Sequence, residues 1–221
     1  MFLFIVVTLL DKHIKEFLEL YHNFRLVDSN RKHIATLQGT ITIVDENNQI
    51  WSDYDIRIEI SHAYPYTIPS IYEESKLIER DWEFHISKEG KCCLDIHHSM
   101  LLKRRKGISL INFYQNVIYP FFANHQYKVN EGSYANGEYK HFEKGIIQYY
   151  EEELDLTDRD YILKLIDSAI LGTKYARNNT CTICGSPKFK KCCLPKINKL
   201  TLFGKDQLKT DYGIFASLSI N

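Results

Sequence analysis

The sequence predicts an α+β protein with an antiparallel meander of strands flanked by helices, followed by a small cysteine-rich unit. Three observations predict it: an amphipathic helical segment near the start, two β-rich runs joined by a short polar turn, and four cysteines clustered far downstream. With 221 residues, of which 44% are hydrophobic, the chain can bury the core of one medium domain plus an appendage.

The first expected element is a helix over residues 11–24. Its apolar side chains recur at helical spacing, namely Ile14, Phe17, Leu18 and Tyr21. The apolar segment 1–10 before it is too short to span a bilayer, and it lacks a basic leader and a small-residue cleavage site. We therefore expect packed structure there and no membrane partner, with an export signal as the weaker alternative.

Residues 37–44 and 50–60 are expected to pair as an antiparallel hairpin across the polar turn 45–49. In the second run isoleucine and tyrosine alternate with charged residues, which predicts one buried face and one wet face. The segment 63–69 contains two prolines and predicts a rigid turn into the next strand. The long irregular segment that follows, up to Ile96, is of a length that usually serves function.

Further helices are expected over residues 108–122, with Pro120 shortening or bending the end, and over 142–154. Asp158 is placed to cap another helix that reaches Leu171 and stops at Gly172. The basic run 103–106 is read as a solvated loop, although it can also contact an acidic partner.

The irregular segment contains the pair Cys92-Cys93, with His85 eight residues before Cys93. A thiolate is a strong nucleophile, and a nearby imidazole can donate a hydrogen bond to an oxyanion or accept a proton. The plainer alternatives are a buried, inert thiol and a histidine that only ties down the loop. His97 and His98 are expected to be solvated.

The order of these elements, with the Tyr-Pro turn at 64–65 and the run Gly90-Lys-Cys-Cys-Leu-Asp95, resembles the ubiquitin-conjugating enzyme family, in particular its divergent bacterial members. The resemblance covers about residues 11–155. It implies that Cys93 forms a thioester, that Cys92 is a buried neighbour, and that His85 replaces the family's oxyanion-stabilising asparagine. It further implies a ubiquitin-like modifier or protein C-terminal tail, an activating enzyme and a target protein as partners, with a bacterial anti-phage conjugation system as the setting that the resemblance suggests.

The second motif is the cluster Cys181, Cys184, Cys192 and Cys193, whose four thiolates can close the tetrahedral site that zinc prefers. It resembles the SEC-C zinc motif, with slightly different spacing. A redox pair at Cys181 and Cys184 is the alternative. The expected domains are a conjugating-enzyme-like domain (1–155), a connecting helix (156–177), a zinc knuckle (178–196) and a tail (197–221).

The 28 basic and 28 acidic residues balance, so composition gives no overall attraction to nucleic acid or to an anionic membrane. Six cysteines arranged as one pair and one cluster fit a reducing compartment better than a disulfide framework, which favours the cytoplasm. Two other functions remain open: a catalytically inert module that binds a modifier or peptide, and a zinc-knuckle adaptor that binds nucleic acid through Lys188, Lys190 and Lys191.

Overall fold

The computed structural model describes residues 8–27, 35–135, 138–172 and 176–218. They form two compact units. The N-terminal unit comprises Met1–Asp95 and Lys103–Glu138, and the C-terminal unit comprises Ile96–Leu102 and Tyr139–Asn221. The chain therefore leaves the N-terminal unit after Asp95 and returns to it at Lys103.

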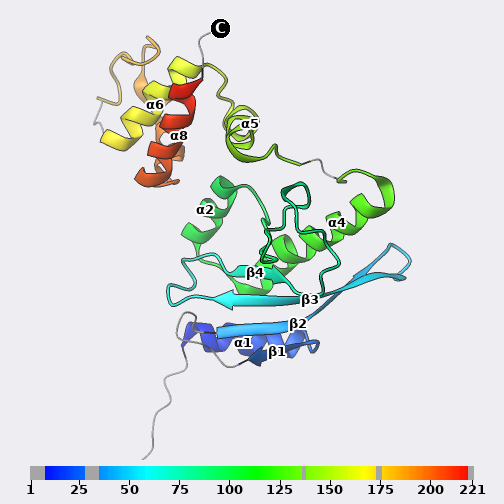
Figure 1. The fold of residues 1–221 in the computed structure, drawn as a ribbon. Coiled ribbons are helices and arrows are strands. Elements are labelled where there is room, and N and C mark those ends of the chain that lie inside the picture. The colour runs from blue at the N-terminus through cyan, green and yellow to red at the C-terminus, as the bar shows by residue number, and fades with distance from the viewer. Residues whose placement is uncertain (1–7, 28–34, 136–137, 173–175, 219–221) are drawn as a thin grey trace, which may run out of the picture. The chain divides into compact units, whose positions relative to one another are not determined.

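A four-stranded antiparallel sheet forms the centre of the N-terminal unit, in the order β1-β2-β3-β4 (Figure 1). Its strands are β1 (Phe24–Val27), β2 (Ala35–Val44), β3 (Ile50–Ile60) and β4 (Ser70–Glu73). The predicted hairpin and the predicted α+β class are both confirmed. Strand β1 was not predicted, because four residues are too few to establish an alternating pattern.

The two faces of the sheet differ as the alternation in β3 predicts. Leu37, Ile41 and Ile58 on one face are fully buried. On the other face Thr40 donates a hydrogen bond to Asp55 (2.7 Å), and Thr42 donates one to Asp53 (2.5 Å). These cross-strand pairs fix the register of β2 and β3 on the side that faces water.

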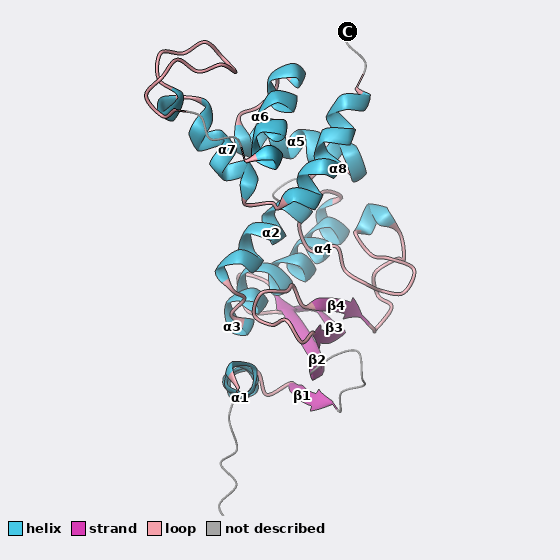
Figure 2. Cartoon of the chain, turned by 90° about the vertical axis from the view of Figure 1, so that its left-hand side faces the viewer, coloured by secondary structure: helices cyan, strands magenta, loops and turns pink. Residues whose placement is uncertain are grey.

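Helix α1 (Leu9–Leu20) begins with a capping box between Thr8 and Asp11. It ends before residue 24, where we expected its end, because Phe24 already belongs to β1 and pairs with Gly39. A Cβ at Gly39 would lie 2.5 Å from the Phe24 ring, so only glycine fits there. Helix α1 lies beside strand β1 (Figure 2). Phe17 of α1 packs edge-on against Phe24, with ring centroids 5.2 Å apart.

The expected helix over 108–122 is longer and less regular than predicted. It consists of α3 (Leu110–Phe113), a π-helical turn η2 (Tyr114–Ile118) and α4 (Tyr119–Glu131). Pro120 does not end it: the proline follows the π-helical turn η2 directly and lies in the first turn of α4, which continues to Glu131. Phe122 of α4 packs against Tyr54 on the buried face of the sheet, with centroids 5.0 Å apart.

The C-terminal unit contains α5 (Phe142–Leu154) and α6 (Arg159–Leu171), as predicted. Asp158 accepts a hydrogen bond from the Tyr161 N–H, and Gly172 ends α6 in the left-handed conformation, so both predicted caps are confirmed. Two further helices, α7 (Cys193–Thr201) and α8 (Lys205–Ser217), were not predicted. Most of the segment 197–221, which was expected to be a tail, is therefore helical.

Helix α2 (His97–Lys106) was also missed. Its residues 97–102 belong to the C-terminal unit, and the basic run 103–106 forms its last turn instead of a loop. Positive side chains at that end complement the helix dipole. The expectation that His98 is solvated is wrong, because its imidazole Nε2 lies 2.8 Å from a carboxylate oxygen of Asp211 and both side chains are fully buried. None of the helices described by the structure has both the length and the apolar character that crossing a membrane requires.

Candidate functional site

The segment before Cys93 is held on both sides by main-chain contacts. Lys91 forms an isolated antiparallel bridge with Tyr72 of β4, and the Cys92 N–H donates to the Ile71 carbonyl (2.9 Å). On the other side Cys92 forms a bridge with Ile86. Residues 91–92 thus lie as a short extended segment between β4 and residue 86, and Cys93 lies at its end.

This extended backbone separates the two thiols. Successive side chains of an extended segment point to opposite sides, and here Cys92 is only 7% exposed, whereas Cys93 is exposed. The expectation that Cys92 is the buried neighbour is confirmed. Desolvation raises the pKa of both thiols; it is strongest at the buried Cys92, and at Cys93 the sulfur is partly shielded although the residue as a whole is exposed. The carboxylate of Glu73 raises the pKa of Cys92 further, and that of Asp95 does the same for Cys93.

A buried ion pair anchors the loop that leads to the cysteines. Glu73, 1% exposed, pairs with Arg80 and accepts hydrogen bonds from the Ser75 hydroxyl and from the Leu77 N–H (3.2 Å). Arg80 also donates to the Glu73 carbonyl oxygen (2.8 Å). Gly90 has φ +85°, and a Cβ there would lie 2.6 Å from that same oxygen, so glycine is required.

His85 is joined to Cys93 through the main chain. Its carbonyl accepts a hydrogen bond from the Cys93 N–H (2.8 Å), and its own backbone is left-handed (φ 55°). The imidazole Nε2 lies 3.0 Å from a carboxylate oxygen of Glu138, and the ring lies 5.8 Å from that of Tyr134. Sequence reasoning missed Glu138, because 53 residues separate it from His85.

Aromatic rings and a lysine ammonium lie near the pair formed by His85 and Glu138. The ammonium of Lys128 lies 4.4 Å from the Tyr134 ring centroid and 5.0 Å from that of Phe84, and it donates to the Glu83 carbonyl (3.2 Å). Burial and the charge of Glu138 raise the pKa of Tyr134 to about 12, so this phenol stays neutral at physiological pH. On the other side of Cys93, the Asp95 carboxylate pairs with Lys103 (2.7 Å).

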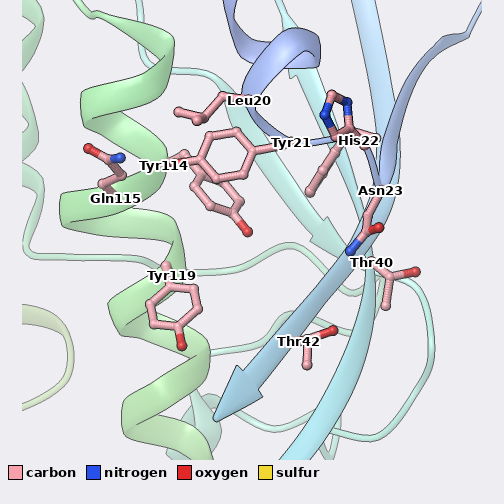
Figure 3. Close-up of a pocket in the computed structure, with 10 residues that line it drawn as sticks. Leu20, Tyr21, His22, Asn23, Thr40, Thr42, Tyr114, Gln115 and Tyr119 are labelled. Carbon is pink, nitrogen blue, oxygen red and sulfur yellow. The ribbon is translucent and has the colours of Figure 1, made fainter. Parts of the chain in front are cut away.

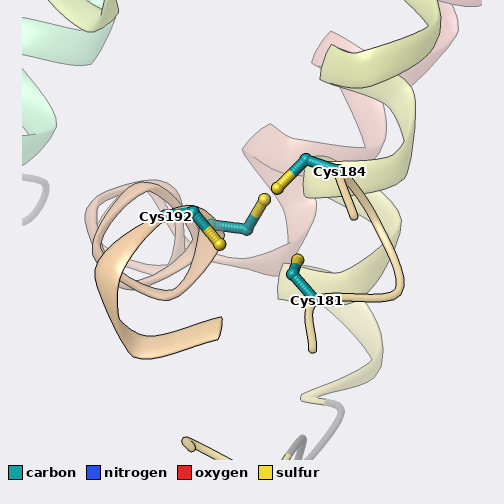
Figure 4. Close-up of side chains that lie close together, drawn as sticks. Cys181, Cys184 and Cys192 are labelled. Carbon is teal, nitrogen blue, oxygen red and sulfur yellow. The ribbon is translucent and has the colours of Figure 1, made fainter. Parts of the chain in front are cut away.

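The four C-terminal cysteines converge. Their sulfur atoms all lie within 4.8 Å of one another, although they come from a loop and from the start of α7 (Figure 4). A knuckle forms the first half: the Gly185 N–H donates to the Cys181 carbonyl (2.9 Å), and the Cys181 N–H donates to Ser186 (2.8 Å). The prediction that these four cysteines can bind a metal ion is confirmed.

The surroundings of the sulfurs suit metal ligands. Cys181 and Cys193 are buried, whereas Cys184 is exposed and lies within hydrogen-bond distance of the Ser186 hydroxyl (3.3 Å). Hydrogen bonds from Ser186 lower the pKa of Cys184 to about 6, which favours the thiolate that a metal needs. The Tyr161 hydroxyl contacts the Cys193 sulfur (3.2 Å) and serves as an outer partner.

A pocket of about 550 Å³ lies between the end of α1, strand β2 and the π-helical turn η2 (Figure 3). Three tyrosines, Tyr21, Tyr114 and Tyr119, line it together with the hydroxyls of Thr40 and Thr42. Its lining contains neither a thiol nor a carboxylate, and Cys93 is not among the residues that line it.

Comparisons with protein-family models, with curated proteins and with solved structures find no match for this chain. A functional assignment therefore depends on the two sites themselves. These are the loop that presents Cys93 beside the main chain of His85, and the cluster of four cysteines in the C-terminal unit.

Proposed function

We propose that this protein is a conjugating enzyme of the ubiquitin type, which accepts an acyl group on Cys93 as a thioester and transfers it to a protein amine. The observation that carries the proposal is the separation of two adjacent thiols. Cys92 is buried and Cys93 is exposed at the end of a segment fixed by main-chain hydrogen bonds. An exposed, rigidly presented thiol is what a repeated acyl transfer requires.

The order of elements in the N-terminal unit supports the same function. Along the chain there follow a helix, a four-stranded antiparallel meander with a Tyr-Pro turn between β3 and β4, an anchored loop with Cys93 and a long helical segment. That order agrees with the resemblance to ubiquitin-conjugating enzymes drawn from the sequence. A fold alone does not determine the chemistry, so the proposed function depends on Cys93.

In the first step the thiolate of Cys93 attacks the thioester carbonyl of the acyl donor carried by an activating enzyme. The carbonyl carbon becomes tetrahedral with an oxyanion, and its collapse expels the donor's thiolate and leaves the acyl group on Cys93. One sulfur replaces another, so no oxidant or external energy source is needed. The donor is the C-terminal residue of a ubiquitin-like protein or of another protein tail.

In the second step the amine of a target lysine attacks the Cys93 thioester. The nitrogen must lose a proton, and the Cys93 thiolate leaves. His85 is the proposed acceptor of that proton, because the carboxylate of Glu138, 3.0 Å from Nε2, stabilises a protonated imidazole. The protonated imidazole then loses its proton to solvent, which restores the site.

The cysteine cluster is proposed to hold a structural zinc ion. Four thiolates are the ligand set that closes a zinc site, and they leave no open position for a substrate. The position of Cys193 at the start of α7 supports a role for the ion in folding the C-terminal unit. Cytoplasmic location and a part in an anti-phage conjugation system belong to the same proposal.

A second candidate is an inert module of the same fold that binds a modifier or peptide. Two observations favour it: the pKa of Cys93 is raised by burial and by Asp95, and Nε2 of His85 faces Glu138. Such a module would form no thioester, and its binding would not change when Cys93 is replaced.

The two candidates are separated with a synthetic peptide that ends in a glycine thioester. The wild type, Cys93→Ala and the matched neighbour variant Cys92→Ala are each incubated with it, and adducts are compared with and without an excess of a small thiol, which cleaves thioesters by thiolysis. We expect a thiol-labile adduct on the wild type and on Cys92→Ala, and none on Cys93→Ala. An adduct that persists without Cys93 and disappears without Cys92 would exclude the assignment.

A further inference from the structure

The charges of the C-terminal unit are unevenly distributed along the chain. Residues 168–205 contain eight lysines and arginines and no aspartate or glutamate. Helices α5 and α6, which precede this segment, contain six acidic residues. The balanced total of 28 basic and 28 acidic residues therefore conceals a strongly basic segment that includes all four cysteines of the cluster.

The fold gathers four of these cations beside the cysteine knuckle. The Lys190 N–H donates to the Arg177 carbonyl (2.9 Å), and the Phe189 N–H donates to the Asn179 carbonyl (2.9 Å). These two bonds join the segment before the knuckle to the short 3-10 helix η3 (Phe189–Lys191) after it. The cations on these adjoining segments are all exposed, namely Arg177, Lys188, Lys190 and Lys191.

The main chain that carries these cations is anchored in the core of the C-terminal unit. Phe189, between Lys188 and Lys190, is only 2% exposed and belongs to the same buried cluster as Cys181 and Cys193. The lysines on either side of it are exposed. A ligand that binds here would therefore meet cations on a fixed main chain, which lowers the entropy cost of binding.

The charge of these four residues is not neutralised by the described part of the chain. None of the ion pairs found among the described residues involves any of the four. Two other lysines of the segment are engaged within the unit, since Lys196 and Lys199 donate to the carbonyls of Asp155 (3.3 Å) and Glu153 (2.7 Å). Four thiolates exceed the charge of one zinc ion by about two, so the cluster does not require all four cations for charge balance.

We propose that the basic surface formed by Arg177, Lys188, Lys190 and Lys191 binds nucleic acid through its phosphates. A protein partner usually presents charges of both signs, and it is matched by a surface where cations and carboxylates alternate. Nucleic acid is uniformly anionic, and it is matched by a surface with cations alone. Since phosphate contacts carry no sequence information, we expect little preference for base sequence. This binding goes beyond the proposed acyl transfer and does not require Cys93.

The test measures binding of the full-length protein to a labelled 20-nucleotide oligouridylate by fluorescence anisotropy, over a range of KCl concentrations. Four phosphate contacts predict that log K falls with log[KCl] with a slope of about −3. The combined variant Lys188→Gln, Lys190→Gln and Lys191→Gln should bind at least about tenfold more weakly at low salt, with a slope shallower by about 2. The matched control replaces three exposed lysines of the N-terminal unit by glutamine, namely Lys12, Lys15 and Lys88. It changes the net charge equally and should bind like the wild type.

Three results would overturn the proposal: no binding by the wild type at low salt, equal weakening in the two triple variants, or competition by polyglutamate as effective as that by unlabelled oligouridylate. The last would assign the surface to acidic protein segments. Circular dichroism and metal content check that the variants fold. If the triple variant of the basic surface does not, Arg177→Gln alone should make the slope shallower by about 0.7. The assay uses neither a modifier nor a thioester, so its outcome is independent of the proposed transfer reaction.

Discussion

At Cys93 two effects act on the thiol in the same direction. Burial raises its pKa, the Asp95 carboxylate raises it further, and the ammonium of Lys91 only partly opposes them. The thiol is therefore mostly protonated at neutral pH, which protects it from oxidation and from nonspecific alkylation. Under the proposed function, Cys93 would have to lose its proton when the acyl donor is bound.

This predicts the pH dependence of Cys93. Because its pKa lies above the ordinary value, the thiolate fraction should rise about tenfold per pH unit throughout the neutral and mildly alkaline range. The iodoacetamide rate at Cys93, followed by peptide mass spectrometry from pH 6.5 to pH 9, should increase without levelling off. A plateau near pH 7 would mean that the thiol is activated in the free protein.

His85 should matter for the second transfer and not for the first. His85→Ala is expected to slow transfer from acylated Cys93 to free lysine by about 100-fold, the usual contribution of a general base, and to leave adduct formation unchanged. His62→Ala, an exposed histidine of the same unit, is the control. Equal transfer rates in the two variants would remove His85 from the mechanism.

At the scale of elements, the loop between β4 and Cys93 depends on the buried pair of Glu73 and Arg80. Among the described contacts of the Glu73 carboxylate, Arg80→Ala leaves the hydrogen bonds from Ser75 and Leu77, and we expect the free energy of unfolding to fall by about 3 kcal/mol. Lys88→Ala, at an exposed position of the same loop, should change it by less than about 0.5 kcal/mol. Urea titrations measure both, and equal values would show that the pair does not stabilise the loop.

The elements that could be predicted are those whose signals are local. The hairpin β2–β3 and helices α5 and α6 follow from alternation, helical spacing and caps such as Asp158. Strand β1 is too short to give such a signal, and the π-helical turn η2 depends on packing. Helices α7 and α8 were missed because their apolar residues pack into a core that only the folded C-terminal unit provides.

The same distinction holds for the sites. Cys93, Cys92 and the four-cysteine cluster could be found because each is a compact run in the sequence. Glu138 beside His85 and Asp211 beside His98 could not, since 53 and 113 residues separate the partners. Contacts of that range are set by the fold, and a single sequence does not record them.

At the scale of the whole molecule, the cysteine cluster and the apolar core of the C-terminal unit are one structure. Cys181, Phe189 and Cys193 belong to the same buried cluster as Leu165 of α6 and Leu200 of α7. Loss of a metal ion from the four sulfurs would therefore loosen the helices around them as well as the knuckle.

Metal analysis of the purified protein should find one zinc ion per chain. Removal by a chelator is expected to lower the melting temperature and the helical circular dichroism signal, because packing around Cys193 and α7 is lost. Cys184→Ser should weaken zinc binding in the same way, whereas Cys92→Ala should not change the zinc content. A metal-free protein with an unchanged melting temperature would contradict a structural role.

The most direct test of the central claim is a single-turnover chase. The wild-type protein is acylated with the peptide glycine thioester and freed of excess reagent, and it is then mixed with free lysine while intact mass and peptide mass are followed. We expect an acyl group on Cys93 that disappears at the same rate as acyl-lysine forms. An acyl group found on another residue, or one on Cys93 that only hydrolyses and yields no acyl-lysine, would contradict it.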